Sequence, residues 1–520
     1  MATMTAISRM SRRRPTTVFR LFALAVVLAV PAVIGLVTMG RSPLQDQTGV
    51  PGAVPSAPAP APARSAPPPG APSDPIVRPT VSGPPAVASP SPAVAPTPSV
   101  PPGGPSTPLV TGLVAGSVNR TSINLSAEYQ ATVRLNFGTR SFLVSSTMTV
   151  TNTSGVAIDY LELNTIAARL GGMSIRVAQS DGRAVRATVS DQTIRLPLGG
   201  TLRPGATVTV RIAYRATLRS DTAGSNWLFT RANGVLAAHR WLPWISRLTA
   251  FNRPNHGDPF VTPISPRVRV TIVADRTIRW ATTGEQTGAN ATTTTFEARN
   301  VRDFAFTGAP DYRSTSATVD GVVVRVWYRS GFPASTVLAA AKSALAREAR
   351  LLGPYPMKSY ELAQTGGGYG MESPGLTWIP TGAGSLTYLV AHETAHQWFY
   401  GIVGNDQARQ PYADEAATDF VARYVTGLRR ASRCSTARLD LTIYQYSSAC
   451  YYEDIYIQGG NFLDDTRRRM GATAFWAGIR DYLATYRYRI GSTKALLDTL
   501  DRHTPLNLVP RYEPRFPGIY

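Results

Sequence analysis

The segment at residues 386–396 constrains the fold most strongly, because His392-Glu-Thr-Ala-His396 sets two histidines one helical turn apart. Apolar residues precede the motif at helical spacing, and Ser385 stands where an N-cap is expected, so the spacing predicts a helix. On that helix both imidazoles leave the same face and can bind one Zn²⁺ at about 2.0–2.1 Å each. Glu393 can then reach a water on the metal and act as general base.

A zinc site of this kind needs a third ligand, which a second helix must supply. Eighteen residues separate His396 from Glu415, the predicted ligand, and Asp419 follows one turn later, where it can accept a hydrogen bond from a ligand histidine. The alternative is an ordinary buried helix whose histidines are core residues. Only five histidines occur in the chain and two of them lie in this motif, so chance is a poor explanation.

The N-terminal 112 residues read as targeting and tethering segments. Residues 1–20 are basic and contain no acid, which predicts a cytoplasmic tail, and residues 21–40 are apolar and about long enough to cross a bilayer. A transmembrane anchor is favoured over a cleaved signal sequence, and both place the rest of the chain outside the cytoplasm. Residues 41–112 are rich in Pro and Ala, which predicts a disordered linker.

Residues 113–318 contain short alternating segments rich in Val, Thr and Ile, such as 131–136, 145–151, 207–213 and 268–273, separated by turn residues. This pattern predicts an all-β N-terminal domain of antiparallel sheets. Residues 319–520 read as a mostly helical catalytic domain, with a strand at 322–328, a helix through 339–349 and helices beyond Glu415. The predicted fold class is therefore α+β and multidomain.

The glycine-rich run 366–375 lacks the lysine of a phosphate-binding loop, so that reading is rejected. Two interpretations remain open. The run can be an irregular edge segment that lets a peptide backbone approach, with Glu372 facing the substrate, or a plain glycine turn with Glu372 exposed.

Cys434 and Cys450 are the only cysteines, and outside the cytoplasm a disulfide between them is expected. Although the net charge is +21, the sequence contains no nucleic-acid recognition motif, so nucleic acid is excluded as a partner. Attraction to anionic lipids or anionic envelope polymers is the favoured interpretation.

The segment His392-Glu-Thr-Ala-His-Gln-Trp-Phe399, followed by Glu415, resembles the aminopeptidase N family of gluzincin zinc peptidases. Tyr369-Gly-Met-Glu-Ser373 is similar to the exopeptidase motif of that family, and Tyr456-Ile-Gln-Gly-Gly460 to the segment that bears its catalytic tyrosine. The resemblance covers residues 113–505. It implies a saddle-like β domain followed by a thermolysin-like catalytic domain.

The resemblance also implies a role for each matching position. Glu393 would activate water, Tyr456 would donate a hydrogen bond to the developing oxyanion, and Glu372 would bind the free α-amine of a peptide. The zinc ligands would be His392, His396 and Glu415, and the substrate-facing strand would carry Gly370 and Met371 beside Glu372.

Three departures from the family pattern qualify this expectation. Tyr369 and Ser373 replace the usual glycine and asparagine of the exopeptidase motif. Asp258 is the candidate for the N-domain group that helps to hold the α-amine. After residue 505 the sequence has no counterpart of the large C-terminal helical domain found in many members, so a short form is expected.

These features together predict an extracytoplasmic, membrane-tethered zinc metallopeptidase that acts on peptides, most simply as an aminopeptidase. An endopeptidase on the same site is the first alternative. A non-catalytic protein that binds peptides or envelope components on a peptidase scaffold is the second.

Overall fold

A computed structural model of the protein describes residues 112–252, 257–434 and 436–520. The basic tail, the apolar segment and the linker predicted for residues 1–112 lie outside the described residues, apart from residue 112. Among the described helices, none combines the length and the apolar character that crossing a membrane requires.

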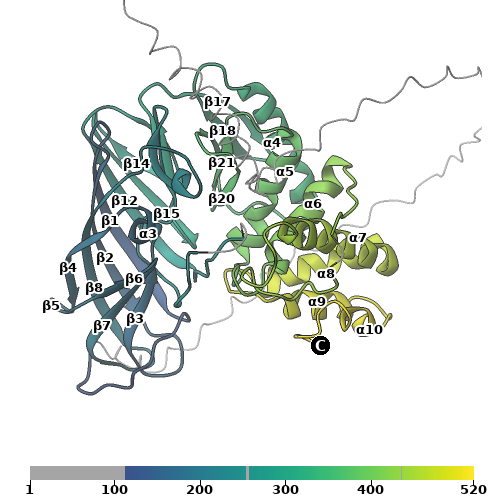
Figure 1. The fold of residues 1–520 in the computed structure, drawn as a ribbon, viewed down its shortest axis with the longest axis horizontal. Coiled ribbons are helices and arrows are strands. Elements are labelled where there is room, and N and C mark those ends of the chain that lie inside the picture. Colours follow the sequence, from purple (N-terminus) through teal and green to yellow (C-terminus); the bar gives the residue numbers. More distant parts are fainter. Residues whose placement is uncertain (1–111, 253–256, 435) are drawn as a thin grey trace, which may run out of the picture. The chain divides into compact units, whose positions relative to one another are not determined.

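The main body of the N-terminal half is an eight-stranded sheet. Its strands are β1 (Ser126–Asn136), β2 (Ser141–Thr151), β4 (Ser174–Ser180), β5 (Arg183–Ala184), β8 (Thr207–Thr217), β12 (Ser265–Ala274), β14 (Glu285–Ala289) and β15 (Thr293–Val301). They follow the order β14-β15-β12-β1-β2-β8-β4-β5 (Figure 1), and all four of the example strands read from the sequence are confirmed in β1, β2, β8 and β12. Buried and exposed residues alternate along β1 and β2, as one covered sheet face requires.

Two four-stranded sheets complete this half. One contains β13 (Arg279–Thr282), β16 (Phe306–Ala309), β10 (Val235–Ala238) and β9 (Phe229–Ala232), and the other contains β11 (Trp244–Ile245), β3 (Ile158–Asn164), β7 (Thr193–Leu202) and β6 (Thr188–Ser190). The domain is not purely β, because it includes a 3-10 turn, η1 (Asn226–Leu228), and a short helix, α3 (Ile166–Leu170), whose N-terminus is capped by the Thr165 side chain.

A five-stranded sheet opens the C-terminal half, with the order β17-β18-β19-β21-β20. The strands are β17 (Arg313–Val319), β18 (Val322–Tyr328), β19 (Ser359–Thr365), β20 (Met371–Ser373) and β21 (Leu376–Pro380). The predicted strand 322–328 is confirmed, and the sheet already begins at Arg313, before residue 319. Strand β20 pairs only with β21, antiparallel, so the glycine-rich run leads into an edge strand.

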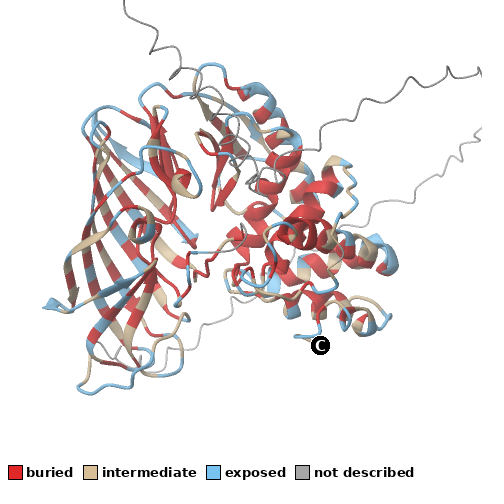
Figure 2. Ribbon diagram, in the orientation of Figure 1, coloured by how far each residue is buried: buried red, intermediate tan, exposed pale blue. Residues whose placement is uncertain are grey.

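Helices form most of the rest of this half, and they are buried most fully around α5 (Figure 2). Helix α4 (Ala334–Leu352) contains the predicted helix and packs on β17, β18 and α5 (Leu386–His396). Beyond them lie α6 (Ala417–Thr426), α7 (Gly459–Met470), α8 (Ala472–Thr485), α9 (Thr493–Arg502) and α10 (Val509–Tyr512).

Three π-helical segments adjoin these helices: η2 (Gln397–Ile402) continues α5, η3 (Tyr412–Ala416) precedes α6 and η4 (Tyr452–Gln458) precedes α7. Such widened turns are rare and occur often at functional sites. Residue periodicity does not predict these segments, although each carries or follows a predicted site residue.

The chain between α6 and η4 is irregular rather than helical, and a disulfide between Cys434 and Cys450 closes part of it, with 16 residues of sequence separation. Replacing both cysteines by serine is expected to destabilise the protein by about 3 kcal/mol, the loop-closure value for a ring of this length. The midpoint of thermal unfolding should fall by a few degrees. Reductant should lower the wild-type midpoint equally and leave the double variant unchanged, whereas equal midpoints throughout would contradict the prediction.

Candidate metal and substrate site

Three predicted ligands converge on one point. His392 and His396 leave α5 on the same face, with their Nε2 atoms 3.2 Å apart. Oε2 of Glu415, from η3, lies 3.4 Å from the first nitrogen and 3.5 Å from the second. Two ligands at tetrahedral zinc distances are about 3.3 Å apart, so these spacings fit a single zinc ion. All three side chains are buried.

The electrostatics of the cluster favour the ionised form of Glu415, which is the form that binds metal. Burial opposes ionisation of Glu415, but the adjacent imidazoles of His392 and His396 outweigh burial and lower the pKa of Glu415. The carboxylate therefore stays charged at neutral pH, as a hard ligand requires.

The partner of His396 differs from the one predicted. Its Nδ1 lies 2.9 Å from Oδ1 of Asp414, the residue directly before the ligand Glu415. The prediction that Asp419 accepts a hydrogen bond from a ligand histidine is wrong, because its two oxygens accept from the Tyr388 hydroxyl and from Arg423, and Nδ1 of His392 has no hydrogen-bond partner among the described residues. The wide turn of η3 directs the Asp414 side chain toward the zinc helix. Asp419 instead links α6 to the start of α5 through the Tyr388 hydroxyl.

Glu393 lies beside the cluster and against the edge strand. It is 5% exposed, and burial, opposed in part by the two histidines, raises its pKa to about 7. A carboxylate of this basicity suits proton transfer near neutral pH. A Cβ atom added at Gly370 would lie only 2.0 Å from Oε1 of Glu393, so the glycine makes the room that this side chain occupies.

Tyr456 lies in η4, and its ring stacks on that of His392 with 5.5 Å between centroids and 20° between planes. Burial and the carboxylate of Glu415 raise the pKa of Tyr456 well above its usual range. The phenol therefore keeps its proton and can serve as a hydrogen-bond donor.

Glu372 stands on β20 and is 5% exposed, which removes the alternative of a glycine turn with an exposed glutamate. Its Oε1 accepts a hydrogen bond of 3.1 Å from Nε2 of Gln407. The side chain of Met371, its neighbour, packs in the core of the N-terminal half, and the predicted contact of this strand position with substrate stays a prediction.

An acid from the N-terminal half reaches the same region. After burial, the charge of Asp258 is among the causes that raise the pKa of Glu372, Glu393 and Tyr456. The adjoining Gly257 is packed so closely that an added Cβ would lie 2.7 Å from the Tyr451 hydroxyl. The weak sequence match at Asp258 therefore has a place beside the site.

Two functional neighbours were missed by sequence reasoning. Asp414 stands next to a predicted ligand, and that adjacency could have suggested it. Gln407 gave no local signal, because its partners Glu372, Asp414 and Arg240 are supplied by three separate parts of the chain.

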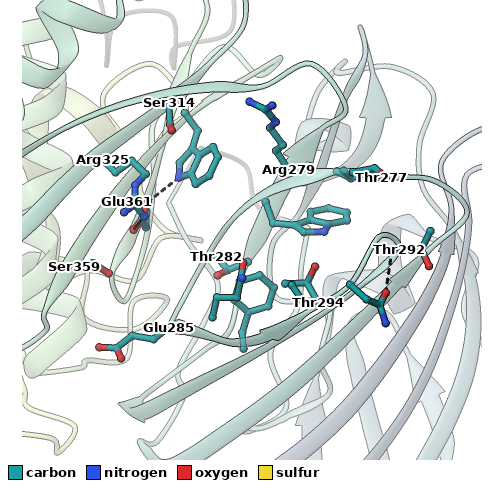
Figure 3. A pocket seen from close by; sticks show the side chains of 18 of the residues that line it. Thr277, Arg279, Thr282, Glu285, Thr292, Thr294, Ser314, Arg325, Ser359 and Glu361 are labelled. Atoms are coloured by element: carbon teal, nitrogen blue, oxygen red, sulfur yellow. Dashed lines mark hydrogen bonds and ion pairs between the residues drawn. The ribbon is translucent and has the colours of Figure 1, made fainter.

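A separate cavity of 710 Å³ lies between strands β13–β15 and strands β17–β19, and none of its lining residues belongs to the metal cluster. Figure 3 shows Ser359 and Glu361 on one side and Thr292 and Thr294 on the other. Four basic and two acidic side chains line it. The predicted attraction to anionic envelope polymers is not tested by this geometry and stays a prediction.

Behind the zinc helix, α4 contributes an isolated carboxylate. Glu348 is fully buried, and among the described residues neither of its oxygens has a hydrogen-bond partner. Burial raises the pKa of Glu348 well above its usual value of 4.5, with a smaller opposing effect from His396. The folded protein therefore keeps this proton while the unfolded chain releases it, so stability is lost as pH rises above that value.

Replacing Glu348 with methionine should remove this penalty. We expect the variant to gain about 1–3 kcal/mol at pH 8 and little at pH 5, from the loss of an unpaired buried acid. Thermal unfolding at both pH values measures the difference, with Lys342→Met on the exposed side of the same helix as control. A loss of stability at both pH values would show that Glu348 has an unrecognised partner.

A scan against models of protein families finds no match for this chain. Solved structures do match. An M1 zinc metallopeptidase from Deinococcus radiodurans is 22% identical, with a TM-score of 0.58, and the match covers 75% of this chain and 94% of that one. A mutant of the Deinococcus radiodurans enzyme bound to a Tyr-Ser-Ala substrate gives 21% identity and a TM-score of 0.58 over the same shares.

A mutant of a two-domain M1 zinc metallopeptidase bound to L-arginine is 23% identical, with a TM-score of 0.57, over 73% of this chain and 91% of that one. The chain therefore has the fold of the M1 zinc metallopeptidases, a β-rich N-terminal part followed by a helical C-terminal part. The resemblance read from the sequence is confirmed at the level of the fold.

Proposed function

We propose that this protein is a zinc-dependent metallopeptidase that removes N-terminal residues from peptides. One observation carries the proposal: three metal-ligating atoms, a basic carboxylate and a second acid on an edge strand meet in one buried site. The M1 neighbours whose mutants hold a tripeptide substrate and a free amino acid support peptides as the substrate class.

Zinc, held by His392, His396 and Glu415, would supply a Lewis acid for the scissile carbonyl and make water acidic enough to react near neutral pH. Glu393 would take the proton of the attacking water and hand it to the leaving amine. Tyr456 would donate its hydroxyl proton in a hydrogen bond to the oxyanion of the tetrahedral intermediate.

The direction in which a peptide binds would be set by acidic residues on the N-terminal side of the scissile bond. Glu372 would accept the cationic α-amine, with Asp258 adding negative charge from the N-terminal half. When the α-amine is held in place, the peptide bond one residue away is positioned for cleavage. This fixed distance from the N-terminus distinguishes an exopeptidase from an endopeptidase. The basic and apolar segments at residues 1–40 lead us to place this activity outside the cytoplasm.

The test uses the zinc-loaded full-length chain with fluorogenic aminoacyl amides, the same substrates acetylated at the amine, and Glu372→Ala. We expect cleavage of free-amine substrates only, loss of activity on chelation and its return with zinc. For Glu372→Ala we expect KM to rise at least about tenfold, because a charge-assisted contact is lost.

Equal cleavage of the acetylated substrates would replace the proposal with an endopeptidase. Zinc binding without turnover of either set would point to a peptide-binding scaffold. Failure to bind zinc would refute both peptidase functions.

A further inference from the structure

We infer that Gln407 is a positioning residue. It fixes the position of the amine-binding carboxylate of Glu372 relative to the proposed zinc ligand His396. The inference rests on the proposed function and adds a specificity-determining side chain to it. Gln407 is 3% exposed and lies in the loop between η2 and η3, outside both the edge strand and the zinc helix.

The two carboxylates that this amide joins face each other inside the protein. Nε2 of Gln407 lies 3.1 Å from Oε1 of Glu372 and 2.8 Å from Oδ2 of Asp414. The other oxygen of Asp414 meets Nδ1 of His396 at 2.9 Å. A continuous chain of hydrogen bonds therefore runs from the substrate-amine site to the zinc ligand, with Gln407 at its centre.

The orientation of the amide is fixed by its third neighbour. Oε1 of Gln407 lies 3.4 Å from Nη2 of Arg240, which is a donor only and also donates to the Tyr400 hydroxyl at 2.8 Å. The carbonyl must face this guanidinium, so both N–H groups face the acids. Arg240 belongs to the N-terminal half, so the setting of the amide depends on both halves.

An amide is suited to this position for a physical reason. Atoms of Glu372, Asp414 and His396 lie within 4.8 Å of one another, so two carboxylates crowd one buried space. A glutamine gives each of them an N–H without adding charge. Methionine has similar length but no donor, and glutamate would add a third negative charge in a buried space.

Two properties should therefore change together when the amide is lost. Glu372 would lose the donor that aims it, which weakens recognition of a free α-amine. Asp414 would lose the donor on its far oxygen, which loosens the carboxylate that orients His396. A residue with a merely structural role would lower the unfolding temperature without moving either property.

The experiment compares the full-length zinc-loaded protein with Gln407→Met, Gln407→Glu and the matched control Gln410→Met. Gln410 lies three residues away, half-exposed, and its side chain accepts from the Thr493 backbone rather than from a site residue. The measurements are KM and kcat on free-amine substrates, the ratio of free-amine to acetylated cleavage, and the zinc dissociation constant by competition with a chelator.

For Gln407→Met we expect KM to rise about tenfold with kcat within about threefold, and the preference for a free amine to fall in step. The zinc dissociation constant should rise about tenfold, as for other residues that orient a metal ligand. Gln407→Glu should show the same losses, because a carboxylate also lacks the N–H groups, and it keeps the size of the side chain if methionine unfolds the protein.

Values for both Gln407 variants within about twofold of Gln410→Met would overturn the inference. Loss of kcat alone, with KM and zinc affinity unchanged, would also overturn it. An inactive wild-type protein would refute the proposed function instead, and the zinc dissociation constants of the same variants would still decide the role of Gln407.

Discussion

Replacing Glu393 with glutamine is expected to lower kcat by about a thousandfold, within the range that positioned general acid–base groups contribute. Glutamine has almost the same shape but cannot accept the proton of the attacking water. The raised pKa of about 7 that burial gives Glu393 marks it as the group for that task. Since the proposed zinc ligands His392, His396 and Glu415 are unchanged, zinc content should stay at one ion per chain.

Initial rates on a free-amine fluorogenic substrate, with zinc measured on the same samples, check this prediction. Glu361→Gln is the matched control. Glu361 is also a buried glutamate of the C-terminal half, but it lies on β19, pairs with Arg325 and Trp327 of β18 and is not part of the metal cluster. A Glu393→Gln enzyme that keeps more than about a tenth of the wild-type kcat would show that another group takes the proton.

The zinc helix and its third ligand could be predicted because the chemistry dictates the spacing. Two imidazoles one turn apart fix the helix, and His392 and His396 do lie with facing nitrogens. The strand at β18 and the long helix α4 followed from apolar periodicity alone. These are local signals, so one sequence suffices to read them.

The residue that orients His396 could not be predicted in the same way. A regular helix through Glu415 would make Asp419 the neighbour one turn on, and that reasoning failed because η3 is a π-helical turn. The widened turn changes which side chains face α5 and aims Asp414 at His396. A prediction from sequence periodicity assumes a regular α-helix. Asp419 is therefore predicted because the backbone is assumed to be regular, and not because the residue type is misjudged.

Gln407 shows a second limit. Its bonding partners come from β20, η3 and the loop after β10, and the backbone N–H of Gln407 donates to Phe260 at 3.0 Å. Such a network forms only when the two halves of the protein meet. No spacing rule within one segment predicts it.

Replacing Gly370 with alanine is expected to lower kcat at least about a hundredfold, because the new methyl group takes the space of the general base. The added Cβ would lie 2.0 Å from Oε1, 2.5 Å from Cδ and 2.9 Å from Cγ of Glu393. Glu393 is only 5% exposed and cannot simply swing into solvent. The carboxylate must move away from the water that it would deprotonate, while the proposed zinc ligands His392 and His396 stay in place.

Gly368→Ala is the matched control, because an added Cβ at Gly368 has no atom within 4 Å. The Gly368 variant should keep wild-type kcat, KM and zinc content, and the Gly370 variant should lose kcat while zinc content stays the same. Joining Gly370→Ala to Glu393→Gln gives the sharper result. If the methyl group acts only by displacing Glu393, the double variant should be no slower than Glu393→Gln alone, since both changes remove one function. A further loss of about tenfold in the double variant would show that Gly370 also shapes the path of the substrate backbone along β20.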